Sequence, residues 1–158
     1  MPSKSLTTYW DACVFLSYIN GIPDRMPMID ALLSEAERGE ILIVTSMISV
    51  VEVAFGYAEQ EKKAFSPEME EKIKRLWDGS SPIRLVEFYR HIAEDAQGLI
   101  RIAMQRGWSL KAADAIHLAT ARRMEVGSLH TYDDKLPRYA DDVGLSITAP
   151  ATTKPQLL

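Results

Sequence analysis

The stretch Leu6-Thr7-Thr8-Tyr9-Trp10-Asp11-Ala12-Cys13-Val14-Phe15-Leu16 decides the fold of this chain. Its first five residues predict a short strand, and the apolar residues that follow predict a helix over about 12–20. An acid, Asp11, stands at the junction between the two. A further strand is predicted at 41–44, because Ile-Leu-Ile-Val is a continuous apolar run typical of a strand covered on both faces.

Strands and helices alternate along the rest of the chain. Further strands are predicted at 83–88, 128–132 and 145–148, and helices at about 28–36, 48–58, 67–77, 92–105 and 109–125, the last with Ser109 as its N-cap. This alternation predicts a parallel sheet with crossover helices, and such sheets bind ligands beyond the carboxyl ends of their strands. Asp11 and Asp133 each follow a predicted strand, so we expect both at the same edge of the sheet.

Length and composition indicate one globular domain. At 158 residues the chain can bury a single core, and we expect a domain at 1–148 followed by a loosely held tail at 149–158. The one cysteine, Cys13, excludes an internal disulfide framework and suits a reducing compartment. No apolar stretch reaches membrane-spanning length, and residues 1–5 precede no signal-like apolar segment. We therefore expect a cytoplasmic protein without membrane attachment.

The net charge of the chain does not by itself exclude nucleic acid as a partner. A net charge of −4 argues against nonspecific binding of nucleic acid over a wide basic surface. That argument weakens where several acids bind divalent cations, because bound ions reverse the local charge and can receive phosphate oxygens. Net charge alone therefore leaves the substrate open.

Acidic residues in apolar surroundings are the main chemical signal. They are Asp11, Glu52, Asp114 and the pair Asp133 and Asp134. Carboxylates are seldom buried without partners, and without a cation these would repel one another and raise one another's proton affinity. Mg²⁺ and Mn²⁺ take oxygen ligands, and two such ions can activate a water and stabilise the leaving oxygen of a phosphodiester. The acids therefore predict a metal-dependent enzyme.

Four segments, in this order along the chain, resemble the PIN-domain ribonuclease family and, among its members, the VapC-type toxins of bacterial toxin–antitoxin pairs. They are Asp11–Leu16, Ser49–Glu52, Ala113–Ala121 and Thr131–Asp133. The resemblance extends from Tyr9 to about Ile147. It implies an α/β, PIN-like (Rossmann-like) three-layer sandwich with a central, mainly parallel sheet of four or five strands. It also implies a Mg²⁺- or Mn²⁺-dependent endoribonuclease that cuts single-stranded or structured RNA.

The resemblance implies roles by position. The matching metal-binding acids are Asp11, Glu52, Asp114 and Asp133. Asp134 could replace Asp133, and Thr131 could orient a water or a carboxylate. Cys13 stands where relatives often have Asn or Ser, which weakens the polar support expected there. The implied partners are RNA, a small antitoxin that covers the active site, and a second copy in a homodimer, with the helices at 26–33 and 48–57 as candidate interfaces.

Several other polar residues are weaker candidates. Ser49 could bond the Glu52 carboxylate or a metal-bound water, or equally its own helix backbone. His117, on the same helix face as Asp114, could support a metal-binding acid, although such a histidine more often packs and satisfies its own hydrogen bonds. Candidates for RNA phosphate contacts are Lys111, Lys135 and Arg138. Tyr9 is spaced like a core or interface aromatic residue, and Asp141 and Asp142 are expected in a solvated turn outside the site.

The residues leave two other functions open. A noncatalytic PIN-like module would bind RNA or a protein through the same pocket, although binding alone does not require four acids. A phosphoryl-accepting α/β domain would hold Mg²⁺ beside an aspartate nucleophile, with Asp11 in that role. Such sites gather their acids at strand ends, which Glu52 and Asp114, both on predicted helices, do not match.

Overall fold

The computed structural model describes residues 6–61 and 65–152, in which five parallel strands form one sheet. The strands are β1 (Thr7–Trp10), β2 (Leu42–Ser46), β3 (Ile83–Val86), β4 (Ser128–His130) and β5 (Ser146–Thr148). Their order across the sheet is β3-β2-β1-β4-β5, and every neighbouring pair is parallel. The predicted α/β class and the parallel sheet of five strands are confirmed.

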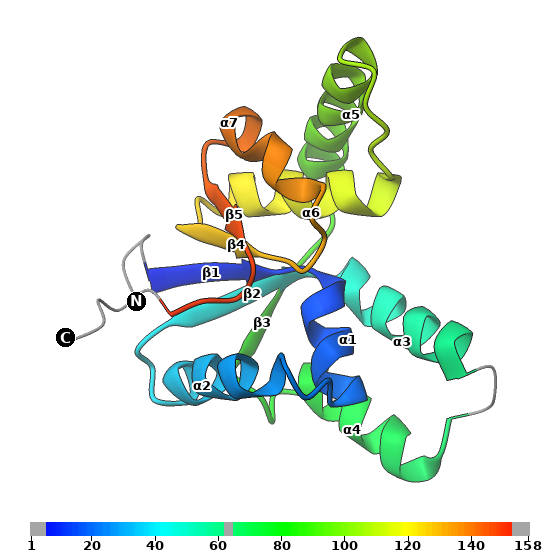
Figure 1. The fold of residues 1–158 in the computed structure, drawn as a ribbon, viewed down its shortest axis with the longest axis vertical. Helices are drawn as coiled ribbons and strands as arrows, with labels where there is room; N and C mark the ends of the chain where they lie inside the picture. The colour runs from blue at the N-terminus through cyan, green and yellow to red at the C-terminus, as the bar shows by residue number, and fades with distance from the viewer. Residues whose placement is uncertain (1–5, 62–64, 153–158) are drawn as a thin grey trace.

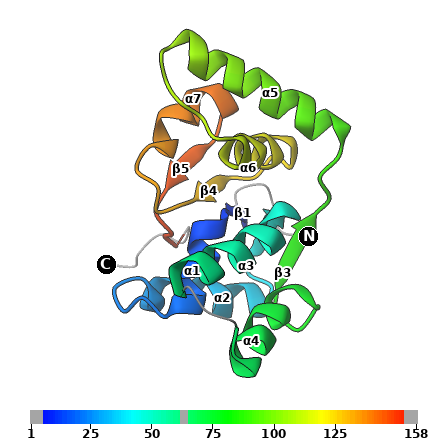
Figure 2. The ribbon, with the colours of Figure 1, turned by 90° about the vertical axis from the view of Figure 1, so that its right-hand side faces the viewer.

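Helices cover both faces of the sheet and complete the predicted three layers (Figures 1 and 2). One side carries α1 (Ala12–Asn20), α2 (Met26–Glu37), α3 (Ile48–Glu61) and α4 (Pro67–Trp77). The other side carries α5 (Arg90–Gln105), α6 (Ala112–Arg123), the 3-10 turn η2 (Leu136–Tyr139) and the short α7 (Ala140–Val143). Within the described ranges, no helix has the length and apolar character needed to span a membrane.

The sheet separates two apolar cores, because successive side chains of a strand point to opposite faces. In β1, Tyr9 packs into the core under α5 and α6, and Trp10 packs into the core with α1 and α2. In β2, Val44 and Ile43 divide between the two cores in the same way. Because both faces are buried, the central strands read as continuous apolar runs rather than alternating ones.

β1 lies where the strand order reverses. The chain proceeds from β1 to β2 and β3 on one side and then to β4 and β5 on the other. At such a point the connections leave the carboxyl ends of neighbouring strands in opposite directions and open a crevice. Asp11 follows β1 directly, and Thr131 begins the loop after β4. The fold therefore places both segments at one opening.

Some predicted boundaries were wrong. The helix that carries Asp114 has Lys111 as its N-cap, not Ser109. The third strand ends at Val86. Most of the predicted tail, 153–158, lies outside the described residues.

The stretch with Asp141 and Asp142 is not a solvated turn. It forms α7, and the Asp142 carboxylate, only 9% exposed, accepts two bonds of 2.7 and 2.8 Å from the Arg106 guanidinium. A helix of four residues is too short to show a helical period in the sequence, which explains why it was missed.

Candidate active site

A pocket of about 250 Å³ lies beyond the carboxyl ends of β1 and β4. Its wall includes Asp11, Glu52, Asp114 and Asp133, which come from the β1–α1 junction, α3, α6 and the loop after β4. The structure thus brings together the four acids that the resemblance ranked first. Asp134 is exposed and is not part of this wall.

Asp11 occupies the N-cap position of α1, but its carboxylate does not cap that helix. Cys13 Sγ donates to Oδ1 at 2.8 Å, and Thr131 Oγ1 donates to Oδ2 at 2.5 Å. The residue is 4% exposed. Burial raises the pKa of the Asp11 carboxyl, and the two donors act against that rise because they stabilise the charged form.

Cys13 supports the site in a way that the sequence did not suggest. Besides donating to Asp11, its sulfur accepts a hydrogen bond from the Tyr132 backbone N–H at 3.2 Å. Burial raises the pKa of the Cys13 thiol to about 12, so the thiol keeps the hydrogen that it donates. The expected loss of polar support at this position is therefore not what the structure shows.

Thr131 connects two of the acids. Its hydroxyl donates to Asp11 and accepts from the Asp133 backbone N–H at 3.0 Å. Asp133 Oδ1 in turn accepts from the Lys135 backbone N–H at 2.8 Å, an Asx-type turn that restrains the side chain. These bonds explain why Asp133, and not Asp134, lies in the pocket wall.

Asp114 is the third residue of α6. This position is nearer the positive end of the helix dipole than predicted, because the helix begins later. Burial raises the pKa of the Asp114 carboxyl, and repulsion from Asp11, Asp133 and Glu52 adds to that rise. The pocket therefore collects negative charge that a cation would stabilise.

Glu52 lies inside α3 and is bonded to a buried histidine. Its Oε1 lies 2.5 Å from His117 Nε2, and His117 Nδ1 lies 2.6 Å from the Tyr9 hydroxyl oxygen. His117 is 1% exposed and does not line the pocket, so it supports Glu52 from the protein interior. Tyr9 was predicted only as a packing residue, since nothing local in the sequence indicates where its hydroxyl points.

Ser49 makes neither of its two expected bonds, to the Glu52 carboxylate or to its own helix backbone. Its hydroxyl lies 2.7 Å from Thr45 Oγ1, and Thr45 donates to the Trp10 carbonyl oxygen at 2.6 Å. Because the Thr45 hydroxyl has one hydrogen, Ser49 is the donor in their bond. Ser49 therefore ties α3 to the strand ends rather than to Glu52.

The cationic residues lie outside the pocket wall. Lys111, Lys135 and Arg138 are exposed, and the Arg138 guanidinium lies 4.7 Å from the centroid of the Trp108 ring system. Arg25, which no sequence signal indicated, lies 3.9 Å from the centroid of the Tyr132 ring, beside the loop that carries Asp133.

The donor set suits a hydrated hard cation. Within 6–61 and 65–152, no three His, Cys, Asp or Glu side chains converge tightly enough to enclose an ion. Mg²⁺, however, is usually held by one or two carboxylates and keeps several waters. A pocket of about 250 Å³ walled by four mutually repelling carboxylates has the volume and the oxygen donors for such an ion.

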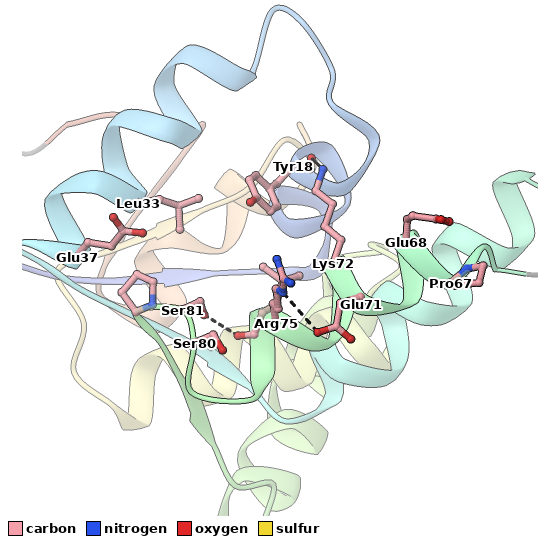
Figure 3. Close-up of a pocket in the computed structure, with 12 residues that line it drawn as sticks. Tyr18, Leu33, Glu37, Pro67, Glu68, Glu71, Lys72, Arg75, Ser80 and Ser81 are labelled. Carbon is pink, nitrogen blue, oxygen red and sulfur yellow. Dashed lines mark hydrogen bonds and ion pairs between the residues drawn. The ribbon is translucent and has the colours of Figure 1, made fainter.

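A larger groove of about 750 Å³ lies among α1, α2 and α4 (Figure 3). Its charges are mostly engaged locally: Arg75 lies 3.4 Å from Glu71, and the Lys72 ammonium lies 4.8 Å from the centroid of the Tyr18 ring. None of the predicted site residues lines it. The chemistry of the wall, and not volume, therefore identifies the smaller pocket as the candidate active site.

The fold and the pocket define an α/β protein with an acidic site at the carboxyl edge of a parallel sheet. The family model described as the PIN domain matches residues 8–142. The chain belongs to the PIN domain family, as the four sequence segments predicted.

Comparison with individual proteins agrees with this assignment. Ribonuclease VapC46 from Mycobacterium tuberculosis is 44% identical over 46 residues, which are 28% of this chain and 35% of that protein, so the match spans about a third of the relative. FitAcB from Neisseria gonorrhoeae has a TM-score of 0.66 at 18% identity, over 90% of this chain and 97% of that one. A toxin–antitoxin complex from Klebsiella pneumoniae has a TM-score of 0.62 at 21% identity, over 91% and 98%. At these identities the structural likeness shows a shared fold.

Proposed function

We propose that this chain is a Mg²⁺- or Mn²⁺-dependent endoribonuclease that hydrolyses RNA phosphodiester bonds, and that it is the toxin of a VapBC-type pair. The observation that carries the proposal is the meeting of four carboxylates from four separate segments in one pocket. Local identity to Ribonuclease VapC46 and the fold shared with a toxin–antitoxin complex support it.

In this proposal Asp11, Glu52, Asp114 and Asp133 hold the metal. A bound Mg²⁺ or Mn²⁺ would supply an activated water and stabilise charge on the leaving oxygen. Asp11 is held by one donor on each oxygen, so its remaining lone pairs are available to the pocket in a single orientation. Thr131 sets that orientation and, through the backbone of the following turn, that of Asp133.

RNA would approach this pocket from the exposed side. Lys111, Lys135 and Arg138 are exposed, and we propose them as contacts to phosphates of the flanking nucleotides. They lie outside the wall, which suits contacts to neighbouring phosphates rather than to the reacting one.

Cleavage assays with single-site variants test the proposal. The purified protein is expected to cut RNA with Mg²⁺ or Mn²⁺ and to stop with EDTA. Asp11→Asn and Asp114→Asn keep the side-chain shape but remove a charged oxygen ligand, so each should lose about 100-fold or more of the activity. The matched control is Asp134→Asn, which changes the exposed neighbour and should cleave like the wild type.

Circular dichroism shows whether each variant is folded. Undiminished cleavage in folded Asp11→Asn and Asp114→Asn proteins would contradict the proposal. RNA binding without cleavage, together with no heat of Mn²⁺ binding in calorimetry, would instead indicate the noncatalytic PIN-like module.

The proposed partners are a small antitoxin and a second copy of the chain. Of the two candidate interface helices, α3 has the exposed apolar face, with Val51 70% and Phe55 66% exposed, whereas Ile29 and Leu32 of α2 are buried. A toxin should arrest growth when expressed alone, and co-expression of the short reading frame expected beside its gene should relieve the arrest. Growth unaffected by an active nuclease would argue against the toxin role.

A further inference from the structure

Tyr9 and His117 form a buried path that ends on Glu52. Tyr9 belongs to β1, His117 to α6 and Glu52 to α3, so three separate elements meet here. The Tyr9 hydroxyl oxygen lies 2.6 Å from His117 Nδ1, and His117 Nε2 lies 2.5 Å from Glu52 Oε1. Tyr9 is fully buried and His117 is 1% exposed, so water does not compete for the bond between them. The path therefore leads from the protein interior to the partly exposed Glu52 at the pocket.

The partners of Tyr9 indicate the direction of its bond to His117. The Ser46 backbone N–H donates to the Tyr9 hydroxyl oxygen at 3.0 Å. The phenol carries a single hydrogen to donate. With the oxygen accepting from Ser46, that hydrogen points to the acceptor 2.6 Å away, His117 Nδ1. A neutral imidazole that accepts at Nδ1 carries its own hydrogen on Nε2.

We propose that Tyr9 is a positioning residue of this site, which holds His117 as the Nε2–H tautomer so that His117 donates to Glu52 and fixes the carboxylate in the pocket. In the opposite tautomer the Nε2 lone pair would face the Glu52 carboxylate at 2.5 Å, an arrangement without a hydrogen to share. This inference rests on the proposed role of Glu52 as a metal-binding acid. Tyr9 acts through His117 and does not touch the substrate.

Glu52 needs such support because nothing else described holds it. It lies within α3, beyond the reach of a capping role, and its side chain is 32% exposed. A glutamate in that position has several rotamers available, and ordering it costs conformational entropy. A bond from a buried imidazole selects one rotamer before a cation arrives. Outer partners of this kind typically change metal affinity or activity by 10–100-fold.

Nitrogen NMR of the metal-free protein tests the tautomer directly. Long-range ¹H–¹⁵N spectra at one fixed pH distinguish a protonated ring nitrogen from an unprotonated one. We expect His117 of the wild type to carry hydrogen on Nε2 alone, and Tyr9→Phe to lose this preference. A hydrogen on Nδ1 in the wild type, in either the other tautomer or the imidazolium, would overturn the proposal.

Calorimetry and kinetics test the consequence. Tyr9→Phe should weaken Mn²⁺ binding and lower kcat by about 10-fold each, with KM for RNA unchanged. His117→Gln, whose amide nitrogen can donate from the place of Nε2, should retain more Mn²⁺ affinity than His117→Leu. The matched control is Tyr139→Phe, which removes a buried hydroxyl from the same apolar core, one that has no hydrogen-bond partner among the described residues.

The outcomes separate this inference from the proposed function. If Tyr9→Phe binds Mn²⁺ as Tyr139→Phe does, or if His117→Leu binds Mn²⁺ as well as His117→Gln, the positioning role is wrong. If the wild type binds Mn²⁺ but cuts no RNA, the proposed function fails, while the NMR and calorimetric results still decide the role of Tyr9.

Discussion

Asp11 shows, at the scale of one residue, how the site departs from ordinary helix chemistry. An aspartate at an N-cap usually accepts a bond from a backbone N–H of the first turn. Ser66, the N-cap of α4, does this, because its Oγ accepts from the Met69 N–H at 3.1 Å. The Asp11 carboxylate instead binds Cys13 and Thr131. The Asp11 carboxylate is therefore oriented by a neighbour in the first turn of α1 and by a residue 120 positions away, and not by the helix backbone.

His130, at the end of β4, carries a prediction about acid stability. It is 1% exposed, and burial lowers the pKa of its imidazole from 6.5 to about 4. The unfolded chain therefore binds this proton more readily than the folded one. Neutral His130 contributes about 3 kcal/mol to the free energy of unfolding. This contribution is fully present above pH 6.5 and is lost as the pH falls toward 4. Denaturant unfolding of the wild type and His130→Leu at pH 7 and 4.5 should show this as a pH-dependent difference.

The comparison between variants is needed because other groups act in the opposite direction. The raised pKa values of Asp11 and Asp114 let the folded protein bind protons before the unfolded chain does. His91→Leu is the comparison variant, since it removes an exposed imidazole from α5 rather than a buried one. An identical pH dependence in the wild type and His130→Leu would show that His130 does not contribute.

At the scale of one element, the faces of α3 lie in three different environments: the core, the pocket and the solvent. Val53 and Tyr57 are buried against the core, and Glu52 reaches the pocket. Val51 and Phe55, four residues apart and therefore on one face, are 70% and 66% exposed. Neighbouring exposed apolar side chains are typical of interaction surfaces, so we propose this face of α3, the helix that carries Glu52, as a docking face.

Gly56 of α3 lies against the side chain of Leu16 in α1. A Cβ added at Gly56 would lie 2.7 Å from Leu16 Cδ1, nearer than real Cβ contacts come. Gly56 and Leu16 both line the pocket, as does Phe55. The absence of a side chain at Gly56 therefore leaves room for the Leu16 side chain in the pocket wall beside the acids.

The exposed face of α3 predicts self-association. We expect the wild type to be a homodimer, and the double variant Val51→Ser with Phe55→Ser to be a monomer, because the apolar area that would be buried between copies is removed. The free energy of unfolding should change little, by about 0.5 kcal/mol for each exposed site. Light scattering after size-exclusion chromatography measures the mass.

Met124→Ser is the matched control for this experiment, because Met124 is also exposed, at the end of α6. It should leave the mass unchanged. A dimer that persists in the double variant would place the interface elsewhere.

At the scale of the whole molecule, the fold brings together charges that are far apart in the chain. The four acids of the pocket span residues 11 to 133, and the pKa of Asp114 is raised partly by repulsion from the other three. Residues that disfavour the folded state in this way are typical of functional sites, where stability is exchanged for activity.

This repulsion predicts how stability responds to metal. In EDTA, Asp114→Asn should melt at a higher temperature than the wild type, because it removes one disfavoured charge. Mn²⁺ should raise the Tm of the wild type, with a stabilisation of about 2.7 kcal/mol at one hundred times the Kd, and should raise the Tm of Asp114→Asn much less. Differential scanning fluorimetry measures both. Asp134→Asn should behave as the wild type, and an Asp114→Asn protein less stable than the wild type in EDTA would refute the argument.

Local patterns in the sequence were sufficient for the order of the elements. Strand and helix periods are short, so the run at 6–20 already contained β1, the Asp11 junction and α1. Short or marginal elements were not predicted: α7 has one turn, and the start of α6 was placed at Ser109 although the helix begins only after Lys111. The helix begins at Ala112, two residues later than a Ser109 cap would place it, and no side chain caps it.

By itself, the sequence determined the α/β alternation, the PIN domain family and which acids could meet, because each depends on residue identity and local spacing. Only the tertiary structure decided what holds those acids. Glu52 is bonded to His117, 65 residues away, and Asp11 to Thr131, 120 residues away. Such bonds arise from the packing of β1, α3, α6 and the loop after β4 around one strand-order reversal, and no local pattern encodes the direction of a side chain across that distance.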